Sequence, residues 1–239
     1  MTPTRTALVV GGSSGIGRAT ALALASDDAA VHVVGRDAAR LADLAAKYPD
    51  ITTHRADATV RAEIDAVLDG IGTVDWLVIA MSGAAGGGPL RDLDLDVLRG
   101  AFDAKFWGHL TTVQAALDHL SADASITFVT AISARASLAG TSGLAAVNGA
   151  IESLVKPLAV ELAPIRVNAV SPGLVDTPWW DGMPADAREA YFARAQEALP
   201  VSRIAQPEDV AQALVFAATN PNLTGTVIES DGGARFTTL

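Results

Sequence analysis

The sequence predicts an α/β fold: a doubly wound parallel sheet of about seven strands with helices on both faces, in three α/β/α layers. Short apolar runs alternate with longer amphipathic stretches along the chain, the order expected where parallel strands alternate with covering helices. The Val- and Ile-rich runs carry no charge until Arg55, which indicates strands buried between two helical layers. Half of the 239 residues are hydrophobic, so the chain can bury a large core.

The elements follow one another without an internal repeat or a linker, which predicts a single domain over residues 1–239. Strands are expected at residues 6–10, 31–34, 51–55, 76–80, 125–130, 166–170 and 226–229. Helices are expected at residues 15–26, 38–47, 61–69, 94–120, 142–162 and 207–218. The irregular stretch at residues 174–200, with a short helix signal at 185–198, follows a strand's carboxyl end, where a lid over a ligand would lie.

Composition excludes several function classes. The chain has 17 basic and 27 acidic residues, a formal charge of −10, which argues against a nucleic-acid partner. It has no cysteine, and its four histidines show no paired ligand spacing, so no metal site is expected. The longest uncharged runs are short and rich in Gly, Ser or Asn, unlike a membrane span, and the first residues lead into a strand without a signal-peptide pattern. We therefore expect a cytoplasmic protein.

A glycine-rich loop lies between the first expected strand and the first expected helix. Glycines permit a tight turn and a close approach of the backbone, while the helix amino terminus offers unpaired N–H groups to a pyrophosphate. This strand–loop–helix context predicts a dinucleotide site. The residues expected to bind the cofactor here are Gly11, Ser13, Ser14, Gly15, Ile16 and Gly17.

With three residues between its first two marked glycines, Gly11 and Gly15, this loop resembles that of the short-chain dehydrogenase/reductase family. The resemblance extends over about residues 6–233 through Asp57-Ala58, residues 158–173, residues 207–211, Thr224-Gly225 and residues 231–233. It implies a Rossmann-like fold, a nicotinamide cofactor and a small-molecule substrate. It also implies that Asp57 and Ala58 lie at the adenine, that Val175, after Pro172 and Gly173, meets the nicotinamide carboxamide, and that Thr177 lies near the phosphates.

The end of the second expected strand bears on the choice of cofactor. An acidic residue at Gly35 would bind the adenosine ribose and repel a 2′-phosphate, so its absence beside Arg36 favours NADP(H) over NAD(H). Alternatively, Arg36 is only a solvated residue at the start of the next helix. The family's Asn-Asn-Ala-Gly run is replaced by residues 79–83, which include Ala80, still expected beside the cofactor, and Gly83.

The positions that carry the family's chemistry are altered. The resemblance assigns the general acid/base Tyr to Leu144, the Lys four residues later to Asn148, and the carbonyl-binding Ser to Ala131. None of these side chains can perform the family's proton transfer. The first hydroxyl after position 131 is that of Ser133, two residues later.

Lys105 occupies the place of the family's Asn on the preceding helix, so Asn and Lys have exchanged helices. We expect Lys105 to orient the nicotinamide ribose and supply a proton, with Asn148 as its partner and Ser133 as the substrate-binding hydroxyl. Alternatively, Lys105 reaches solvent or a carboxylate and the site is inactive. His109, one turn later, shares its helix face or lies in the core, while Trp179, Trp180 and Tyr191 line a substrate wall or anchor the lid.

Three functions follow from these residues. The first is an NADP(H)-dependent oxidoreductase acting on an organic carbonyl, alcohol or conjugated substrate with atypical catalytic residues. The second is an inactive nucleotide-binding regulatory or partner subunit, and the third is a non-redox enzyme in the same cleft. The resemblance also implies a homodimer formed through the long helices, or a homotetramer formed in addition through the last strand and helix. The apolar face of Ile151, Leu154, Val155 and Leu158 fits either the helix contact or packing on the sheet.

Overall fold

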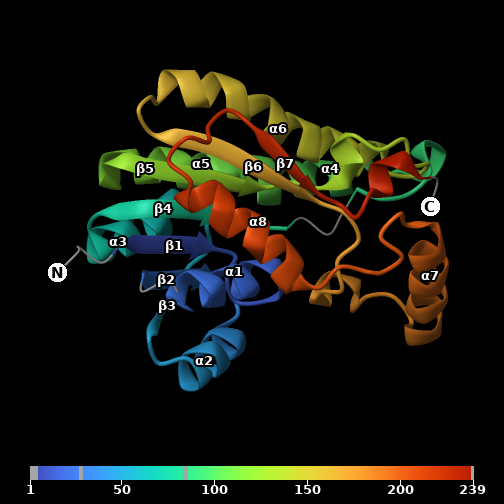
Figure 1. Ribbon diagram of the computed structural model, residues 1–239, viewed down its shortest axis with the longest axis horizontal. Coiled ribbons are helices and arrows are strands. Elements are labelled where there is room, and N and C mark those ends of the chain that lie inside the picture. The colour runs from blue at the N-terminus through green and yellow to red at the C-terminus, as the bar shows by residue number, and fades with distance from the viewer. Residues whose placement is uncertain (1–4, 27–28, 83–85, 238–239) are drawn as a thin grey trace.

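The computed structural model describes residues 5–26, 29–82 and 86–237, and it confirms the expected fold class. Figure 1 shows a sheet of seven parallel strands in the order β3-β2-β1-β4-β5-β6-β7. The strands are β1 (Thr6–Val10), β2 (Ala30–Gly35), β3 (Ile51–Arg55), β4 (Val74–Ile79), β5 (Leu120–Val129), β6 (Arg166–Pro172) and β7 (Val227–Ser230). The helices are α1 (Gly15–Ser26), α2 (Ala38–Lys47), α3 (Arg61–Ile71), α4 (Leu95–Ala101), α5 (Gly108–Ala116), α6 (Ser142–Glu161), α7 (Ala185–Ala198) and α8 (Pro207–Thr219).

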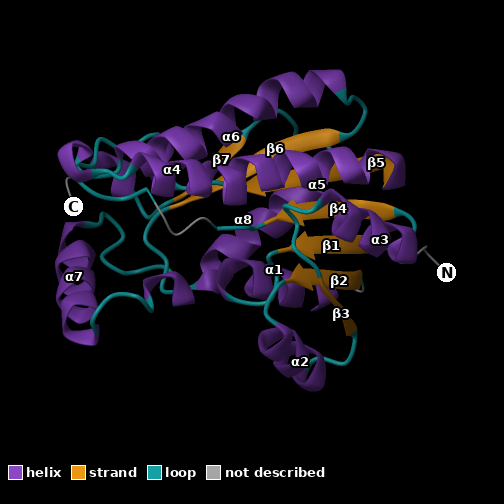
Figure 2. Ribbon diagram, turned by 180° about the vertical axis from the view of Figure 1, so that it is seen from behind, coloured by secondary structure: helices purple, strands orange, loops and turns teal. Residues whose placement is uncertain are grey.

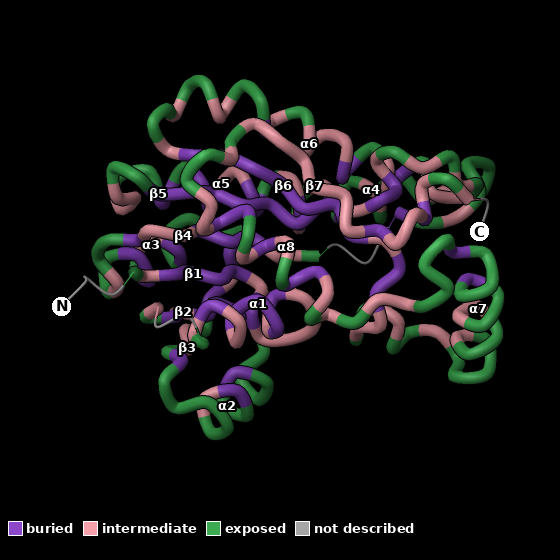
Figure 3. Tube along the Cα trace, viewed as in Figure 1, coloured by how far each residue is buried: buried purple, intermediate pink, exposed green. Residues whose placement is uncertain are grey.

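Two apolar cores hold the helices against opposite faces of the sheet. Leu24 of α1, Leu44 of α2 and Leu214 of α8 are fully buried in one core. Ile64 of α3 and Ile151 of α6 are fully buried in the other, which α5 also joins. Figure 3 shows the central strands buried and much of α2 and α7 exposed. Since neither face of the central strands meets water, their side chains are apolar without alternation, as the sequence indicated.

One expected helix is wrong in detail. The stretch at 94–120 forms α4, then a π-helical turn at Phe102–Trp107, then α5 and a short 3₁₀ turn, and β5 already starts at Leu120. A π turn adds one residue to a helical turn, and such turns are frequent at functional sites. Lys105 lies inside this turn and is buried, whereas Trp107 is 54% exposed.

The order of the strands places a crevice at the carboxyl ends of β1 and β4. The chain runs from β1 outward through β2 and β3, then returns to β4 on the other side of β1. Ligands of open α/β sheets bind at such a reversal point. The glycine loop follows β1, and Ala80 follows β4, so both lie at this crevice; Gly83, expected in the same run, is outside the described residues.

Helix α6 is the helix, among the described residues, whose length and composition would allow a membrane span. Its Ile151 and Val155 are buried against the sheet, and its Asn148 is hydrogen-bonded inside the fold. From the sequence, the apolar face of α6 fitted either a subunit contact or packing on the sheet. Two residues of that face, Ile151 and Val155, pack on the sheet. Figure 2 shows α6 lying along the side of the molecule that holds β6 and β7.

Candidate active site

The loop between β1 and α1 is shaped by contacts that exclude side chains. Gly11 has a φ of +82°, and a Cβ there would lie 2.8 Å from the Ala80 carbonyl carbon. A Cβ on Gly17 would overlap the carbonyl oxygen of Gly11. Gly15 begins α1 with a φ of +52°, so the amino terminus of a 12-residue helix opens on this loop. The bare backbone and helix terminus fit a dinucleotide pyrophosphate.

We expect Gly17→Ala to destabilise the fold by about 1–3 kcal/mol, because the new methyl group forces the Gly11 peptide out of position. The loss is measured as the change in denaturant midpoint at constant slope. Gly70→Ala is the matched control, since Gly70 lies in α3 and, apart from its chain neighbours and the backbone of its own helix, no atom lies within 4 Å of the place that its new methyl group would take. It is expected to be neutral or stabilising. Equal stability of the two variants would contradict the assigned packing.

Hydroxyl and guanidinium groups lie together at the place where the protein is expected to distinguish NADP(H) from NAD(H). Ser13 Oγ lies 2.9 Å from the position that a Cβ on Gly35 would take, so a side chain at the position of the missing acid would require Ser13 to move. Arg40 Nη1 donates to Ser14 Oγ at 3.3 Å, and Arg36 is 71% exposed, 3.8 Å from Asp57. Arg40 was not expected here from the sequence; it lies in the first turn of α2, whereas Arg36 precedes the Asp37 cap of that helix.

The residues expected at the adenosine half of the cofactor follow strands β3 and β4. The Ala80 amide donates to the Val10 carbonyl at 2.8 Å, which aligns the end of β4 with that of β1. Asp57 Oδ1 accepts from the Thr59 amide at 3.0 Å and from its hydroxyl at 2.8 Å, and these bonds lower the pKa of Asp57. Ala58 is buried beside it.

The segment after β6 reaches back to the glycine loop. Pro172 is buried at the end of β6, and a Cβ on Gly173 would lie 2.6 Å from the Asp231 carbonyl oxygen. The Thr177 side chain lies 3.4 Å from the position of a Cβ on Gly15, at the amino terminus of α1. The Val175 carbonyl already accepts from Trp180 Nε1 at 2.9 Å, so a carboxamide would share that oxygen or use the Val175 amide.

The three residues expected to carry catalysis form one hydrogen-bonded chain. Lys105 Nζ donates to Asn148 Oδ1 at 2.7 Å, and Asn148 Nδ2 donates to Ser133 Oγ at 3.1 Å. Lys105 Nζ also approaches the Thr130 carbonyl at 3.5 Å. The π turn, α6 and the loop after β5 each supply one of the three residues. All three are buried, with exposed fractions of 7% or less. The alternative of a lysine that reaches solvent is therefore not what the structure contains.

Burial controls the ionisation of this cluster. Removal from water lowers the pKa of Lys105 to about 8, and the negative charge of Glu152 opposes that shift. Burial, together with the charge of Lys105, lowers the pKa of His109 to about 3, so this histidine is neutral near pH 7. His109 Nδ1 lies 2.6 Å from the Lys105 carbonyl and donates to it, which makes His109 a core residue that braces the π turn.

Comparison with known proteins settles the family. Residues 10–235 match the family model described as Enoyl-(Acyl carrier protein) reductase. The chain belongs to the short-chain dehydrogenase/reductase family. The crystal structure of a small-chain dehydrogenase in complex with NADPH is 34% identical, with a TM-score of 0.85, and covers 98% of this chain and 99% of that one. The family binds a nicotinamide cofactor and small-molecule substrates, and its members are typically oligomeric.

Two relatives of known activity show the range of the family around this chain. A cis-4-hydroxycyclohexanecarboxylate dehydrogenase of Sinomonas cyclohexanicum is 36% identical over 244 residues, which cover 96% of each protein. An NADPH-dependent aldehyde reductase of Arabidopsis thaliana is 28% identical over 250 residues, which cover 96% of this chain and 86% of the relative.

Leu144 and Ala131 are the residues that the family resemblance assigns to the positions of the Tyr and the Ser. Leu144 is partly buried, and its side chain lies 3.8 Å from the position of a Cβ on Gly87. Ala131 is followed by a 3₁₀ turn at Ile132–Ala134 that holds the buried Ser133. Two hydroxyl groups follow β5: that of Thr130 is bound to Glu152, and that of Ser133 accepts from Asn148.

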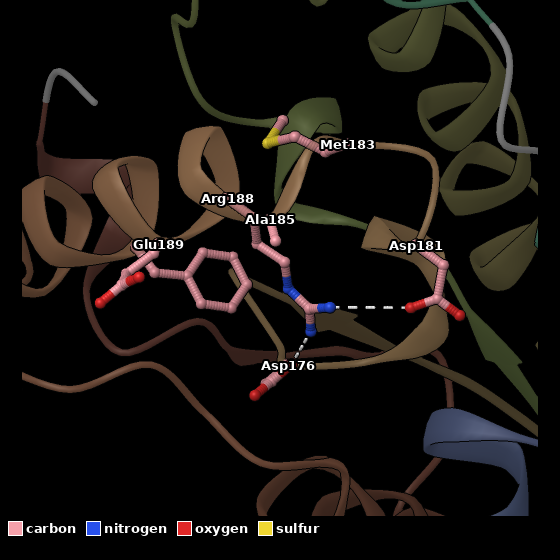
Figure 4. A pocket seen from close by; sticks show the side chains of 7 residues that line it. Asp176, Asp181, Met183, Ala185, Arg188 and Glu189 are labelled. Carbon is pink, nitrogen blue, oxygen red and sulfur yellow. Dashed lines mark hydrogen bonds and ion pairs between the residues drawn. The ribbon is translucent and has the colours of Figure 1, made fainter.

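The expected lid of this family member is an aromatic and ionic cluster around α7. Trp180 packs against Tyr191 and Phe192 at 5.4 Å between ring centroids, which favours the anchoring role over a substrate wall. Figure 4 shows Arg188 of α7 pairing with Asp176 and Asp181 beside a cavity of about 450 Å³. Because Asp176 adjoins Thr177, the ion pair ties the lid helix to the expected phosphate contact.

Proposed function

We propose that this chain transfers hydride between NADP(H) and a small organic carbonyl, alcohol or conjugated substrate, with Lys105, Asn148 and Ser133 in place of the family's usual set. The observation that carries this proposal is the buried hydrogen-bonded chain from Lys105 through Asn148 to Ser133. An inactive site is not expected to retain a buried ammonium group, because burying a charge costs free energy that an apolar residue at the same position avoids.

The cofactor is held, in this proposal, by the three regions that meet at the crevice. NADPH, when bound, supplies the hydride. The glycine loop fits its pyrophosphate, Asp57, Ala58 and Ala80 line the adenosine side, and Val175 and Thr177 lie toward the nicotinamide and the phosphates. Arg36, Arg40, Ser13 and Ser14 surround the place of a 2′-phosphate and are the reason for proposing NADP(H) over NAD(H).

The remaining chemistry falls to the buried chain. The Lys105 ammonium orients the ribose and donates a proton to the oxygen that gains negative charge, and Asn148 fixes the direction of its N–H bonds. Ser133 binds the substrate oxygen through its hydroxyl, since its Oγ accepts from Asn148 and keeps its own proton for donation. An enone or quinone needs less help from an acid than a simple ketone, so conjugated substrates suit this site.

The second candidate, a nucleotide-binding subunit without turnover, is favoured by Leu144, Asn148 and Ala131, which stand at the positions that the resemblance assigns to the family's Tyr, Lys and Ser. We expect calorimetric titration to show micromolar binding of NADPH and at least tenfold weaker binding of NADH. Binding without turnover on carbonyls and enones supports the subunit. Absence of binding by either nucleotide contradicts both candidates and leaves a non-redox ligand.

Assembly belongs to the proposal as well. We propose a homodimer or homotetramer of a cytoplasmic enzyme with neither a nucleic-acid nor a membrane partner. Leu95 is 57% exposed and Trp107 54% exposed, on the side of α4 and the π turn that also holds an open hollow lined by Leu98 and Phe102. An exposed apolar surface of this kind is suited to a second copy of the chain.

A further inference from the structure

A partly buried carboxylate, that of Glu152, lies one turn beyond Asn148 on α6. The Glu152 side chain is 11% exposed, and a separate donor satisfies each of its oxygens. The Thr130 hydroxyl donates to Oε1 at 2.9 Å, and Arg135 Nε donates to Oε2 at 2.8 Å. With both oxygens held, the carboxylate is fixed relative to the end of β5.

Thr130 connects this carboxylate to Lys105. Its backbone carbonyl faces Lys105 Nζ at 3.5 Å, and its hydroxyl binds Glu152. The same threonine therefore has the ammonium on one side and the carboxylate on the other. The proton transfer proposed above does not involve Glu152, although its residue type and its spacing of four from Asn148 were visible in the sequence.

The carboxylate begins a ladder of alternating charges. Arg135 also binds Glu229 at 2.6 Å, Arg235 binds Glu229 at 3.0 Å, and Arg235 binds Asp231 at 2.8 Å. The three carboxylates and two guanidinium groups leave one negative charge, at formal full ionisation. The Lys105 ammonium cancels it, so the cluster is neutral only when Lys105 is protonated.

The groups that face Lys105 come from four elements. Asn148 and Glu152 lie on α6, Thr130 ends β5, Ser133 lies in the following 3₁₀ turn, and His109 lies on α5. His109 is neutral near pH 7 because burial lowers its pKa. Among these described neighbours, Glu152 is the one that carries a charge, and it is the group whose charge stabilises the ammonium.

We propose that Glu152 is a positioning residue that keeps Lys105 protonated inside the fold, acting across Thr130, and that Arg135 fixes Glu152 for this task. The consequence for catalysis rests on the proposed function, in which the Lys105 ammonium is the proton donor. The effect on protonation itself does not. Without Glu152, desolvation acts on Lys105 unopposed, and the amine loses its proton at lower pH.

The chain contains three lysines, Lys47, Lys105 and Lys156, which makes a direct test practical. Protein labelled with ¹³C at the lysine Cε is titrated by NMR without cofactor, and the Lys105 signal is assigned by its absence in Lys105→Met. In the wild-type protein we expect a Lys105 midpoint near pH 8, separate from the two exposed lysines. In Glu152→Gln, which keeps the side-chain shape, we expect that midpoint to fall by about one pH unit or more.

Glu229→Gln is the matched control, because it removes the same charge from the same Arg135 partner one step farther from Lys105. We expect it to lower the Lys105 midpoint by less than Glu152→Gln does, and Glu152→Asp to restore most of the wild-type value. An unchanged midpoint in Glu152→Gln, or equal shifts in both glutamine variants, overturns the proposal. If Glu152→Gln does not fold, Thr130→Val is titrated instead; a lowered midpoint supports the proposal and an unchanged one overturns it.

The two proposals fail separately in this design. Loss of NADPH binding or turnover leaves the NMR titration interpretable, since that titration needs neither. If turnover is found, the pH profile of Glu152→Gln moves with the Lys105 midpoint when Lys105 is the proton donor. If the pH profile of turnover stays the same while the Lys105 midpoint moves, Glu152 still sets the protonation of Lys105. Lys105 is then not the proton donor.

Discussion

Lys105→Met is expected to lower kcat/KM for NADPH-dependent reduction by about 10²–10⁴-fold, the usual contribution of a positioned proton donor. Methionine keeps the length and apolar stem of the side chain but has no proton to give, and it leaves Asn148 Oδ1 without its donor at 2.7 Å. Steady-state rates with an enone and an aldehyde, together with NADPH affinity by calorimetry, separate a chemical defect from a binding defect.

Lys156→Met is the matched control, because Lys156 is exposed on α6 and makes the same change in composition. Its rates should equal those of the wild type. Unchanged turnover and cofactor affinity in Lys105→Met would refute the exchanged Lys–Asn arrangement.

The pH dependence of the wild-type enzyme should report the ionisation of Lys105. Lys105 is charged below its pKa of about 8 and neutral above it, so kcat/KM for reduction should be level at low pH and fall as the pH rises through 8.

Arg36→Ala/Arg40→Ala is expected to weaken NADPH binding by about 10–100-fold and leave NADH binding nearly unchanged. Each guanidinium that loses a charge-assisted hydrogen bond to the 2′-phosphate costs about 1.5–3 kcal/mol, and the exposed position of both side chains reduces that value. Calorimetric titration of both nucleotides with the double variant gives the ratio directly.

Arg61→Ala controls for lost positive charge, because Arg61 is an exposed arginine of α3 that pairs with Asp65. It should bind both nucleotides as the wild type does. Equal losses for NADPH and NADH in the double variant would mean that the two arginines support the loop rather than read the phosphate, and the preference for NADP(H) would then be withdrawn.

Much of the fold was predictable because its determinants are local in the chain. Runs rich in Val and Ile located all seven strands, with β5 starting five residues before its predicted position. The α2 boundaries agree with the prediction, and Asp37 caps that helix by accepting from the amides of Ala39 and Arg40. The glycine spacing placed the phosphate loop, because the close contacts of Gly11 and Gly17 admit no side chain.

The candidate catalytic residues needed the sequence and the family resemblance together. Counting along the family pattern indicated that Lys105 and Asn148 had exchanged places, and the structure places their side chains 2.7 Å apart across 43 residues of chain. Neither residue type is diagnostic by itself. Lys105 and Asn148 became candidates only because of their positions relative to the family pattern.

Only the tertiary structure decided which groups that are far apart in the chain lie next to one another. His32 and His54, without ligand spacing in the sequence, lie 2.9 Å apart on β2 and β3 because parallel strands bring distant residues into register. The link from Glu152 through Arg135 to Glu229 joins three elements in the same way. Periodicity in a sequence reports which face of an element is buried, whereas the protonation of Lys105 depends on the charges that other elements bring to it through a medium of low dielectric constant.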